Sequence, residues 1–360
     1  MTTVLVTGAS GFVGSHVVLE LLREGYTVRG PIPYDTLLSV LAPAGVVSTV
    51  RSHNVARVNK GYESFGDRFA AVVIDDLVTS DLLAVVKGVG AIIHVASPLS
   101  TSATPDVVLE TAVTGTTRIL DAALAAGVKK LVVTESIASL AAPGDYWKDI
   151  TITENSYSRL TREDALKPGV TSFDVYSISK SLSDLTVRNF KRDHPDFDIT
   201  TIHPSYIYGP LGPGQFYDTP ATGTNRHIYA LVAGAPGRPV SEYDPATRAP
   251  PLTVDVRDVA RAHVLALKLP PSESLGRFIL STSRFTWKDA IELLAEKRPE
   301  LKERLPVITG NEPPIGPFAT LDTSKTESVL GMRNYIKWQD TVLATVDDLL
   351  RVEKELARAA

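Results

Sequence analysis

The chain has 360 residues, of which 44% are hydrophobic and 22% are charged, and its formal net charge is -4. This composition is typical of a globular protein with one large domain or two modest ones, and the slight acidity, without a dense basic run, argues against a nucleic-acid partner. The absence of cysteine excludes disulfides, thiolate nucleophiles and cysteine-based zinc sites, and we expect no metal centre.

Hydropathy and the first residues bear on location. No apolar run approaches the roughly 18 residues that a membrane span requires. The opening residues, TTVLVTG, already have the character of a strand, which leaves no room for a signal peptide. We therefore expect a cytoplasmic protein with no membrane partner.

Short apolar runs alternate with amphipathic stretches through the first two thirds of the chain. The predicted strands are residues 3–7, 26–29, 69–74, 91–95, 130–134 and 198–203. The predicted helices are residues 12–24, 80–86, 105–126 and 173–192. This alternation predicts an α/β fold of the Rossmann type, in which helices cover both faces of a doubly wound parallel sheet.

The pattern changes after residue 203, where a stretch rich in proline and glycine begins. Strand followed by helix returns at 253–269, a last strand is predicted at 278–281, and helices are predicted at 286–297 and 338–356. We infer an NADP-binding Rossmann domain of residues 1–204 with about 252–282, and a smaller, mixed C-terminal substrate lobe of residues 205–251 and 283–360.

One segment interrupts the alternation. PIPYDTLLSVLAPAGVVS, residues 31–48, follows the second predicted strand, where a connection is usually only a few residues long. Its single charge is Asp35, and it could be a loop that covers the cofactor, a helix added to the rim, or a translated intron. Its length and apolar composition favour an insertion outside the functional core.

The turn TGASGFVGS places Gly8, Gly11 and Gly14 between a predicted strand and a predicted helix. Gly8 permits a tight turn, Gly11 lets the backbone approach a pyrophosphate, and Gly14 allows the helix to pack closely on the strand. The N–H groups at the start of the helix then face the anion. The turn therefore predicts a dinucleotide site.

The expected dinucleotide is NADP. An NAD site usually offers an acidic residue at the end of the second strand, and residues 26–30 contain none. That strand ends in Arg29, and Arg51 follows the insertion; a guanidinium can pair with the 2′-phosphate of NADP. We favour Arg51, because excising residues 31–48 would bring it against the strand, although both arginines could instead be surface residues.

A tyrosine and a lysine lie one helical turn apart in YSISK, as Tyr176 and Lys180. Such a pair is common on exposed helices, but beside a nicotinamide it has a chemical use. The ammonium favours the phenolate of a tyrosine that is otherwise a sluggish acid at neutral pH, and it can donate to the nicotinamide ribose. Ser136 follows a predicted strand at the carboxyl edge of the sheet, where its hydroxyl could donate to a substrate carbonyl oxygen.

Together these motifs resemble the extended class of the short-chain dehydrogenase/reductase superfamily. Within it, the chain looks like the fungal NADPH-dependent carbonyl reductases, which include methylglyoxal, ketone and aldehyde reductases, and it is more distantly similar to plant dihydroflavonol and cinnamoyl-CoA reductases. The resemblance covers nearly the whole chain and rests on TGASGFVGS, VVIDDL, IIHVASP, AVTGTTRIL, VVTESIAS, YSISK, HPSYIYGP, VDVRDVARAH and FILSTSRFTWKDA.

The resemblance implies a role for each matching position. Ser136, Tyr176 and Lys180 would be catalytic, with Tyr176 delivering a proton while the nicotinamide delivers hydride. The cofactor-binding residues would be Gly8, Gly11, Phe12, Val13, Gly14, Arg51, Asp76, Leu77, Ala96, Ser97, Pro204 and Ile207. In this set Phe12 and Val13 line the pyrophosphate turn, Asp76 and Leu77 hold the adenine, Ala96 and Ser97 lie against the cofactor, and Pro204 and Ile207 border the nicotinamide. For Asp76 the alternative is a helix N-cap.

The sequence departs from the family pattern at three positions. Thr114 and His203 stand where asparagine is usual, and Glu135 stands where serine is usual. Thr114 can still form hydrogen bonds, although an active-site water or proton relay could change. We expect His203 to be structural, and Glu135 to face away, because an unpaired buried carboxylate is costly. Asp258 looks structural, capping or tying the helix that joins the lobes.

Pocket residues are expected from 97–104, 141–158 and 206–229, with Tyr206, Phe216 and Tyr217 as candidates. These stretches offer no evident arginine clamp, although Arg226 is available, so we favour NADPH-dependent reduction of a small-molecule aldehyde or ketone to an alcohol. The alternatives are a nucleotide-sugar epimerase or dehydratase of the same superfamily, with tightly held NAD, and a non-catalytic NADP sensor, which the Tyr176–Lys180 pair argues against. We expect a monomer or a homodimer.

Overall fold

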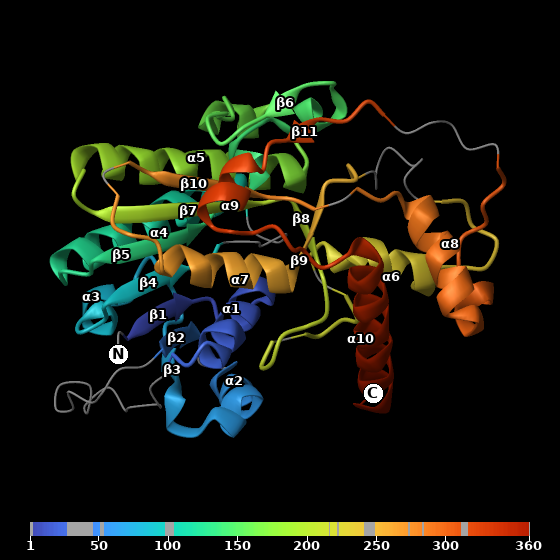
Figure 1. Ribbon diagram of the computed structural model, residues 1–360, viewed down its shortest axis with the longest axis horizontal. Coiled ribbons are helices and arrows are strands. Elements are labelled where there is room, and N and C mark those ends of the chain that lie inside the picture. Colours follow the sequence, from blue (N-terminus) through green and yellow to red (C-terminus); the bar gives the residue numbers. More distant parts are fainter. Residues whose placement is uncertain are drawn as a thin grey trace.

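The computed structural model describes residues 3–26, 46–50, 54–97, 104–215, 217–221, 223–240, 249–272, 274–282, 284–310 and 316–359, with only the backbone described for 46–49 and 359. Its centre is a seven-stranded sheet with the strand order β10-β7-β5-β4-β1-β2-β3 (Figure 1). Every neighbouring pair in this sheet is parallel. The predicted Rossmann-type fold class is confirmed.

The strands of the main sheet are β1 (Val4–Thr7), β2 (Val46–Val50), β3 (Phe69–Val73), β4 (Ala91–His94), β5 (Lys130–Thr134), β7 (Asp198–Pro204) and β10 (Gly276–Leu280). All four residues of β1, VLVT, are buried, as expected for a parallel strand with helices over both faces. β1 pairs with both β2 and β4, so the strand order reverses at β1 and a crevice for ligands is expected beyond its carboxyl end.

Helices cover both faces of the sheet (Figure 1). On one face lie α1 (Phe12–Arg23) and α7 (Val256–Leu267), whose Val17 and Val259 share an apolar core. On the other face lie α3 (Leu82–Val86), α4 (Pro105–Ala125) and α5 (Ser172–Asp193), whose core includes Leu120 and Val187. The helix α2 (Val55–Tyr62) adds Tyr62 to the first of these cores.

A second group of helices lies beside the main sheet, at the right of Figure 1. It consists of α6 (Asn225–Ala233), α8 (Trp287–Lys297) and α10 (Trp338–Ala359), which share an apolar core that includes Ile228, Ile291 and Leu349. Two small parallel sheets pair β8 (Tyr206–Tyr208) with β9 (Thr253–Asp255), and β6 (Thr151–Ile152) with β11 (Thr320–Leu321). The remaining short helices are η3 (Glu63–Arg68), η4 (Ile137–Ser139), η5 (Pro143–Trp147), η6 (Arg162–Leu166), η8 (Pro299–Arg304) and α9 (Ser324–Val329).

The start of α5 is set by its own sequence. The hydroxyl oxygen of Thr171 accepts from the backbone N–H of Asp174 at 3.2 Å, and the Asp174 carboxylate accepts from the Thr171 N–H at 2.9 Å. This reciprocal pair satisfies two N–H groups that would otherwise lack partners. It therefore fixes the first residue of the helix that carries Tyr176 and Lys180.

The structure corrects the prediction of the second strand. The strand beside β1 is β2, Val46–Val50, rather than residues 26–29, and its first three residues had been assigned to the insertion 31–48. Residues 27–45, including Arg29, lie outside the described residues. Both stretches are short and contain β-branched residues, and a pattern of apolar residues cannot say which of two such runs pairs with β1.

Asp258 has the structural role expected of it. Its carboxylate accepts from the backbone N–H of Ile336 at 2.8 Å and pairs with Arg261 at 2.8 Å. It thereby ties α7 to the segment that leads into α10. Across the described ranges, no helix has both the length and the apolar character needed to cross a membrane.

Candidate active site

The glycine turn packs the end of β1 against the start of α1. Gly8 has a φ of 77°, in the left-handed region that favours glycine, and a Cβ on it would lie 3.1 Å from the Cα of Ala96. A Cβ on Gly14 would lie 2.1 Å from the carbonyl oxygen of Gly8, closer than any real contact. The N–H of Gly11 donates to that same oxygen at 3.0 Å. Gly8 and Gly14 therefore have separate steric reasons, whereas a Cβ on Gly11 would lie 3.2 Å from the Gly8 carbonyl oxygen, a tight contact but not an impossible one.

The first turn of α1 has the character of an anion site. Gly11 is its N-cap, and within the described residues no side chain caps the helix and no acidic residue lies in its first turn. Phe12 and Val13, the first two helical residues, are half-buried. The N–H groups and the positive end of the helix dipole therefore face outward with no competing carboxylate, which fits a pyrophosphate.

Thr7 has a positioning role that the sequence analysis missed. Its hydroxyl oxygen accepts from the N–H groups of Val95 and Ala96, both at 3.0 Å, and lies 2.9 Å from Nδ1 of His94. Because the oxygen already accepts twice, its hydrogen can go to the imidazole, which is neutral since burial lowers the pKa of His94 to about 3. This cluster clamps the ends of β1 and β4 together and sets the path toward Ser97.

The residues expected around the adenine lie beyond the end of β3. Asp76 is exposed, and its carboxylate accepts from the N–H of Val78 at 2.5 Å in a local turn. It does not cap a helix, because α3 is capped by Asp81, so the alternative of an N-cap is wrong. Leu77 is half-buried under Gly115, whose added Cβ would lie 3.7 Å from it. Arg51 lies outside the described residues.

Ser136 and Lys180 both lie at the carboxyl end of β5. Ser136 caps η4, and its hydroxyl oxygen accepts from the N–H of Ala138 at 3.2 Å, so its hydrogen can point elsewhere. The Lys180 ammonium donates to the carbonyl oxygen of Thr134, the last residue of β5, at 2.9 Å. Tyr176 lies one turn earlier on α5 and is half-buried. Ser136 and Lys180 therefore lie at one edge of the sheet, and Tyr176 lies on the neighbouring turn of α5.

Aromatic rings flank Tyr176. Its ring stacks on Phe173 with centroids 6.1 Å apart, and Phe173 stacks in turn on Tyr206 at 6.2 Å. Burial, and then the nearby phenols of Tyr206 and Tyr176, raise the pKa of Tyr146 well above its ordinary value. This wall of rings comes from segments far apart in the sequence and suits an apolar or aromatic substrate.

The other expected contacts are more scattered. Pro204 ends β7, next to β5, and Ile207 lies half-buried in β8 with its carbonyl accepting from Thr224. Tyr217 donates to Glu355 of α10 at 2.7 Å. Phe216 lies outside the described residues, as does most of the stretch 97–104.

Two departures from the family pattern do not enter the site as acids or bases. His203 is buried, with its Nδ1 3.0 Å from the Ser139 hydroxyl and its Nε2 2.8 Å from the Thr201 hydroxyl. Burial lowers the pKa of His203 to about 3, so the ring is neutral and supports η4, as expected of a structural residue. Thr114 donates to Glu110 at 2.6 Å in an exposed contact on α4.

Glu135 does not face away, and the expectation of an outward side chain is wrong. It is 1% exposed, its Oε1 accepts from the Ser183 hydroxyl at 2.8 Å, and its Oε2 lies 4.0 Å from the Lys180 ammonium. The physical reason is that α5 supplies both a hydroxyl and a cation to a carboxylate that would otherwise be costly to bury.

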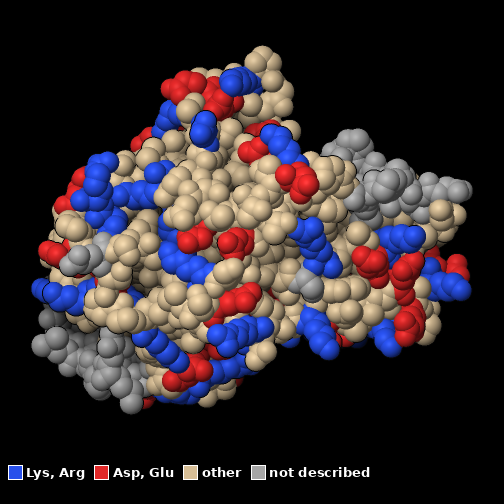
Figure 2. All heavy atoms as spheres, turned by 45° about the horizontal axis from the view of Figure 1, so that its top comes forward, with Lys and Arg blue, Asp and Glu red and all other residues tan. Residues whose placement is uncertain are grey.

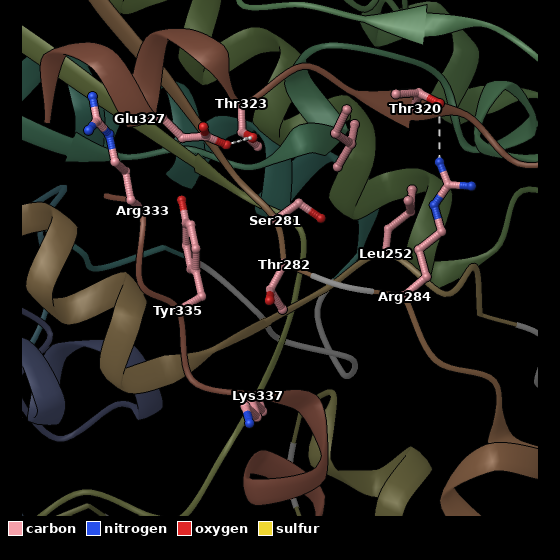
Figure 3. Close-up of a pocket in the computed structure, with 11 residues that line it drawn as sticks. Leu252, Ser281, Thr282, Arg284, Thr320, Thr323, Glu327, Arg333, Tyr335 and Lys337 are labelled. Carbon is pink, nitrogen blue, oxygen red and sulfur yellow. Dashed lines mark hydrogen bonds between the residues drawn. The ribbon is translucent and has the colours of Figure 1, made fainter. Parts of the chain in front are cut away.

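A separate hollow of about 430 Å³ lies beyond the end of β10 (Figure 3). Its lining includes Ser281, Arg284 and Tyr335, and none of the three catalytic candidates belongs to it. In Figure 3, Arg284 turns toward Thr320, to which it donates at 3.1 Å.

Basic and acidic side chains are interspersed on the face shown in Figure 2.

The fold and the glycine turn define a nucleotide-binding α/β protein, in which Ser136 and Lys180 lie at the carboxyl end of β5 and Tyr176 lies one turn earlier on α5. The model of the NAD dependent epimerase/dehydratase family matches residues 4–278, and the chain belongs to this family. The resemblance to extended short-chain dehydrogenases/reductases is thus confirmed.

Curated relatives and a solved structure match nearly the whole chain. Ketoreductase azaE of Aspergillus niger is 33% identical, covering 91% of this chain and 92% of that protein. The NADPH-dependent methylglyoxal reductase GRE2 of Saccharomyces cerevisiae is 29% identical, covering 98% and 99%. The structure of Gre2 from Candida albicans in complex with NADPH has a TM-score of 0.79 at 26% identity, covering 98% and 99%.

Proposed function

We propose that this chain is an NADPH-dependent reductase that converts an aldehyde or a ketone to an alcohol. The observation that carries the proposal is the grouping of Ser136, Tyr176 and Lys180 at the end of β5, two strands along the sheet from the glycine turn of β1. The similarity to a ketoreductase and a methylglyoxal reductase supports the same chemistry.

Each side chain has a distinct task in this proposal. When bound, NADPH supplies a hydride for the carbonyl carbon. Ser136 donates a hydrogen bond to the carbonyl oxygen and thereby orients it. Tyr176 transfers its phenolic proton to that oxygen, and the Lys180 ammonium stabilises the phenolate that is left. The bond from Lys180 to the Thr134 carbonyl keeps the ammonium at this place.

The cofactor contacts are part of the proposal. The N-terminus of α1, with Gly8, Gly11 and Gly14, would hold the pyrophosphate, and the uncapped first turn fits that charge. Asp76 and Leu77 would lie at the adenine, Ala96 and Ser97 along the ribose side, and Pro204 and Ile207 at the nicotinamide. Arg51 would pair with the 2′-phosphate and make NADPH preferred over NADH.

The division into two parts follows the same logic. We assign residues 1–204 and about 252–282 to cofactor binding, and residues 205–251 and 283–360 to the substrate side. The apolar core shared by α6, α8 and α10 is separate from the cores on the two faces of the main sheet, which supports this division. A cytoplasmic location and a monomeric or homodimeric state complete the proposal.

Oxidation of NADPH by the purified chain, measured against a panel of aldehydes, diketones and aromatic ketones, tests the function. We expect turnover with several of these carbonyls and a preference for NADPH over NADH. Arg51→Ala should raise the KM for NADPH far more than the KM for NADH; an equal response would refute the role of Arg51. No turnover with any carbonyl, together with NAD retained through gel filtration, would instead favour an epimerase or dehydratase.

A further inference from the structure

Glu135 connects β5 to the catalytic residues. It lies between Thr134, whose carbonyl accepts from Lys180, and Ser136. Its backbone N–H continues the ladder to β7 by donating to the carbonyl of Ile202 at 2.8 Å. The backbone of this residue is therefore held in the ladder, and its side chain lies in the interface with α5, where it accepts from Ser183.

The two carboxylate oxygens of Glu135 have different surroundings. Oε1 accepts from the Ser183 hydroxyl at 2.8 Å. Oε2 is buried, has no hydrogen-bond donor among the described residues, and lies 4.0 Å from the Lys180 ammonium. The side chains of Glu135 and Lys180 are 0% and 7% exposed, so little solvent screens their attraction.

A second buried carboxylate, that of Asp184 on α5, is balanced by cations other than Lys180. Asp184 accepts from Arg277 at 2.6 Å and from Arg188 at 2.9 Å. Lys180 is therefore left with Glu135 as its anionic neighbour. Asp184 and Arg277 still act on Glu135, since Asp184 raises the pKa of its carboxyl and Arg277 lowers it. The other titratable groups around the pair are the buried neutral imidazoles of His94 on β4 and His203 on β7, and α4 contributes the hydroxyl of Thr116.

A chain of hydroxyls accommodates Glu135 in both protonation states. The Ser183 hydroxyl lies 3.1 Å from that of Thr116, which can donate to the Ala112 carbonyl at 2.8 Å. With Glu135 ionised, hydrogen bonds run from Thr116 through Ser183 to the carboxylate. With Glu135 protonated on Oε1, the direction of these hydrogen bonds can reverse, so that Glu135 donates to Ser183, Ser183 donates to Thr116, and Thr116 donates to the Ala112 carbonyl. Neither state leaves this oxygen unsatisfied.

We propose that Glu135 is a positioning residue for Lys180, an inference that rests on the proposed function. The carboxylate of Glu135 holds the Lys180 ammonium in place and offsets part of its charge. It thereby sets how strongly Lys180 favours the phenolate of Tyr176. An ammonium beside an anion stabilises a nearby phenolate less than an ammonium that acts alone. The carboxylate therefore keeps Tyr176 in its proton-donating form to higher pH.

Titration of Glu135 falls in the range where the enzyme would work. Burial raises the pKa of the Glu135 carboxyl to about 7, while the Lys180 ammonium partly opposes this. The Ser183 hydrogen bond also lowers this pKa, so removing that hydroxyl raises it further. A change in the charge of Glu135 near neutral pH would therefore change how strongly the Lys180 ammonium stabilises the phenolate of Tyr176.

The test compares pH profiles of kcat/KM for reduction of a carbonyl that the wild-type chain turns over, measured from pH 5 to pH 10. Glu135→Gln keeps the shape and removes the charge. Glu110→Gln changes the net charge equally, at an exposed carboxylate on α4 that accepts from Arg162 rather than from Lys180, and serves as the control. NADPH titration of each variant shows whether the cofactor site is intact.

We expect Glu135→Gln to bind NADPH and to lose activity on the alkaline side at a pH lower by roughly half a unit or more, with the inflection near neutrality gone. Ser183→Ala should move that inflection to higher pH, and it carries the test by itself if Glu135→Gln does not fold. Glu110→Gln should follow the wild type. Profiles of Glu135→Gln or of a folded Ser183→Ala that superimpose on the wild type would overturn the role of Glu135, whereas an inactive wild-type chain would overturn the proposed function instead.

Discussion

The sharpest structural prediction concerns Gly14, where α1 meets the turn that follows β1. A methyl group at this position would lie 2.1 Å from the carbonyl oxygen of Gly8 and 2.7 Å from its carbonyl carbon. Both atoms belong to the backbone, so no side chain can rotate away, and ordinary contact with the oxygen begins more than an ångström further out. Gly14→Ala must therefore push the start of α1 off the turn.

The cost of such overpacking is typically about 1–3 kcal/mol. If this free energy destabilises the backbone conformation that binds the pyrophosphate, the apparent dissociation constant of NADPH rises by about 5- to 150-fold. Fluorescence titration with NADPH and thermal unfolding of the free protein measure the two effects. The control is Gly144→Ala, because a Cβ there meets nothing within 4 Å. Wild-type NADPH affinity together with a wild-type unfolding temperature for Gly14→Ala would refute the packing argument.

Two further predictions concern buried titratable groups. Asp184→Asn leaves the guanidinium of Arg277, which is 4% exposed, without the negative charge of its 2.6 Å partner, and should lower the free energy of unfolding in urea by about 3–5 kcal/mol. Asp193→Asn, in a surface pair with Arg192, should change this free energy by less than about 1 kcal/mol, and equal effects of the two variants would contradict the argument. Because the folded-state pKa of His203 is lowered to about 3, its contribution to stability is present above the unfolded value of about 6.5 and is lost as pH falls toward 3, by about 2 kcal/mol at pH 5. Between pH 8 and pH 5, the free energy of unfolding of His203→Asn should fall by about 2 kcal/mol less than that of the wild type. An equal fall in the two proteins would contradict the presence of a buried neutral imidazole.

The fold was predictable because its signals are local. The glycine turn between a strand and a helix, and the alternation that follows it, indicate a parallel sheet before any contact is known. The exception is β2, where a pattern of apolar residues could not distinguish residues 26–29 from Val46–Val50. Pairing with β1 is a long-range property, and neither stretch carries a turn signal that would fix its partner.

The site was predictable only for residues within recognisable motifs. Tyr176 and Lys180 share one helix, so their spacing alone places them on one side of it. Thr7 and Glu135 were missed or misjudged, because their partners come from β4 and α5. A rule that buried carboxylates avoid the interior is correct on average, but it cannot anticipate that α5 presents Ser183 and Lys180 to this one.

Replacement of Tyr176 by phenylalanine tests the central claim most directly, because it removes the proton donor and keeps the ring that stacks on Phe173. The measurement is NADPH oxidation with a carbonyl that the wild-type chain reduces, alongside NADPH titration and with Tyr26→Phe, beyond the far end of α1, as the control. The account predicts a loss of turnover of about 10²- to 10⁴-fold with NADPH binding retained. Turnover within tenfold of the wild type in a variant that binds NADPH normally would contradict it.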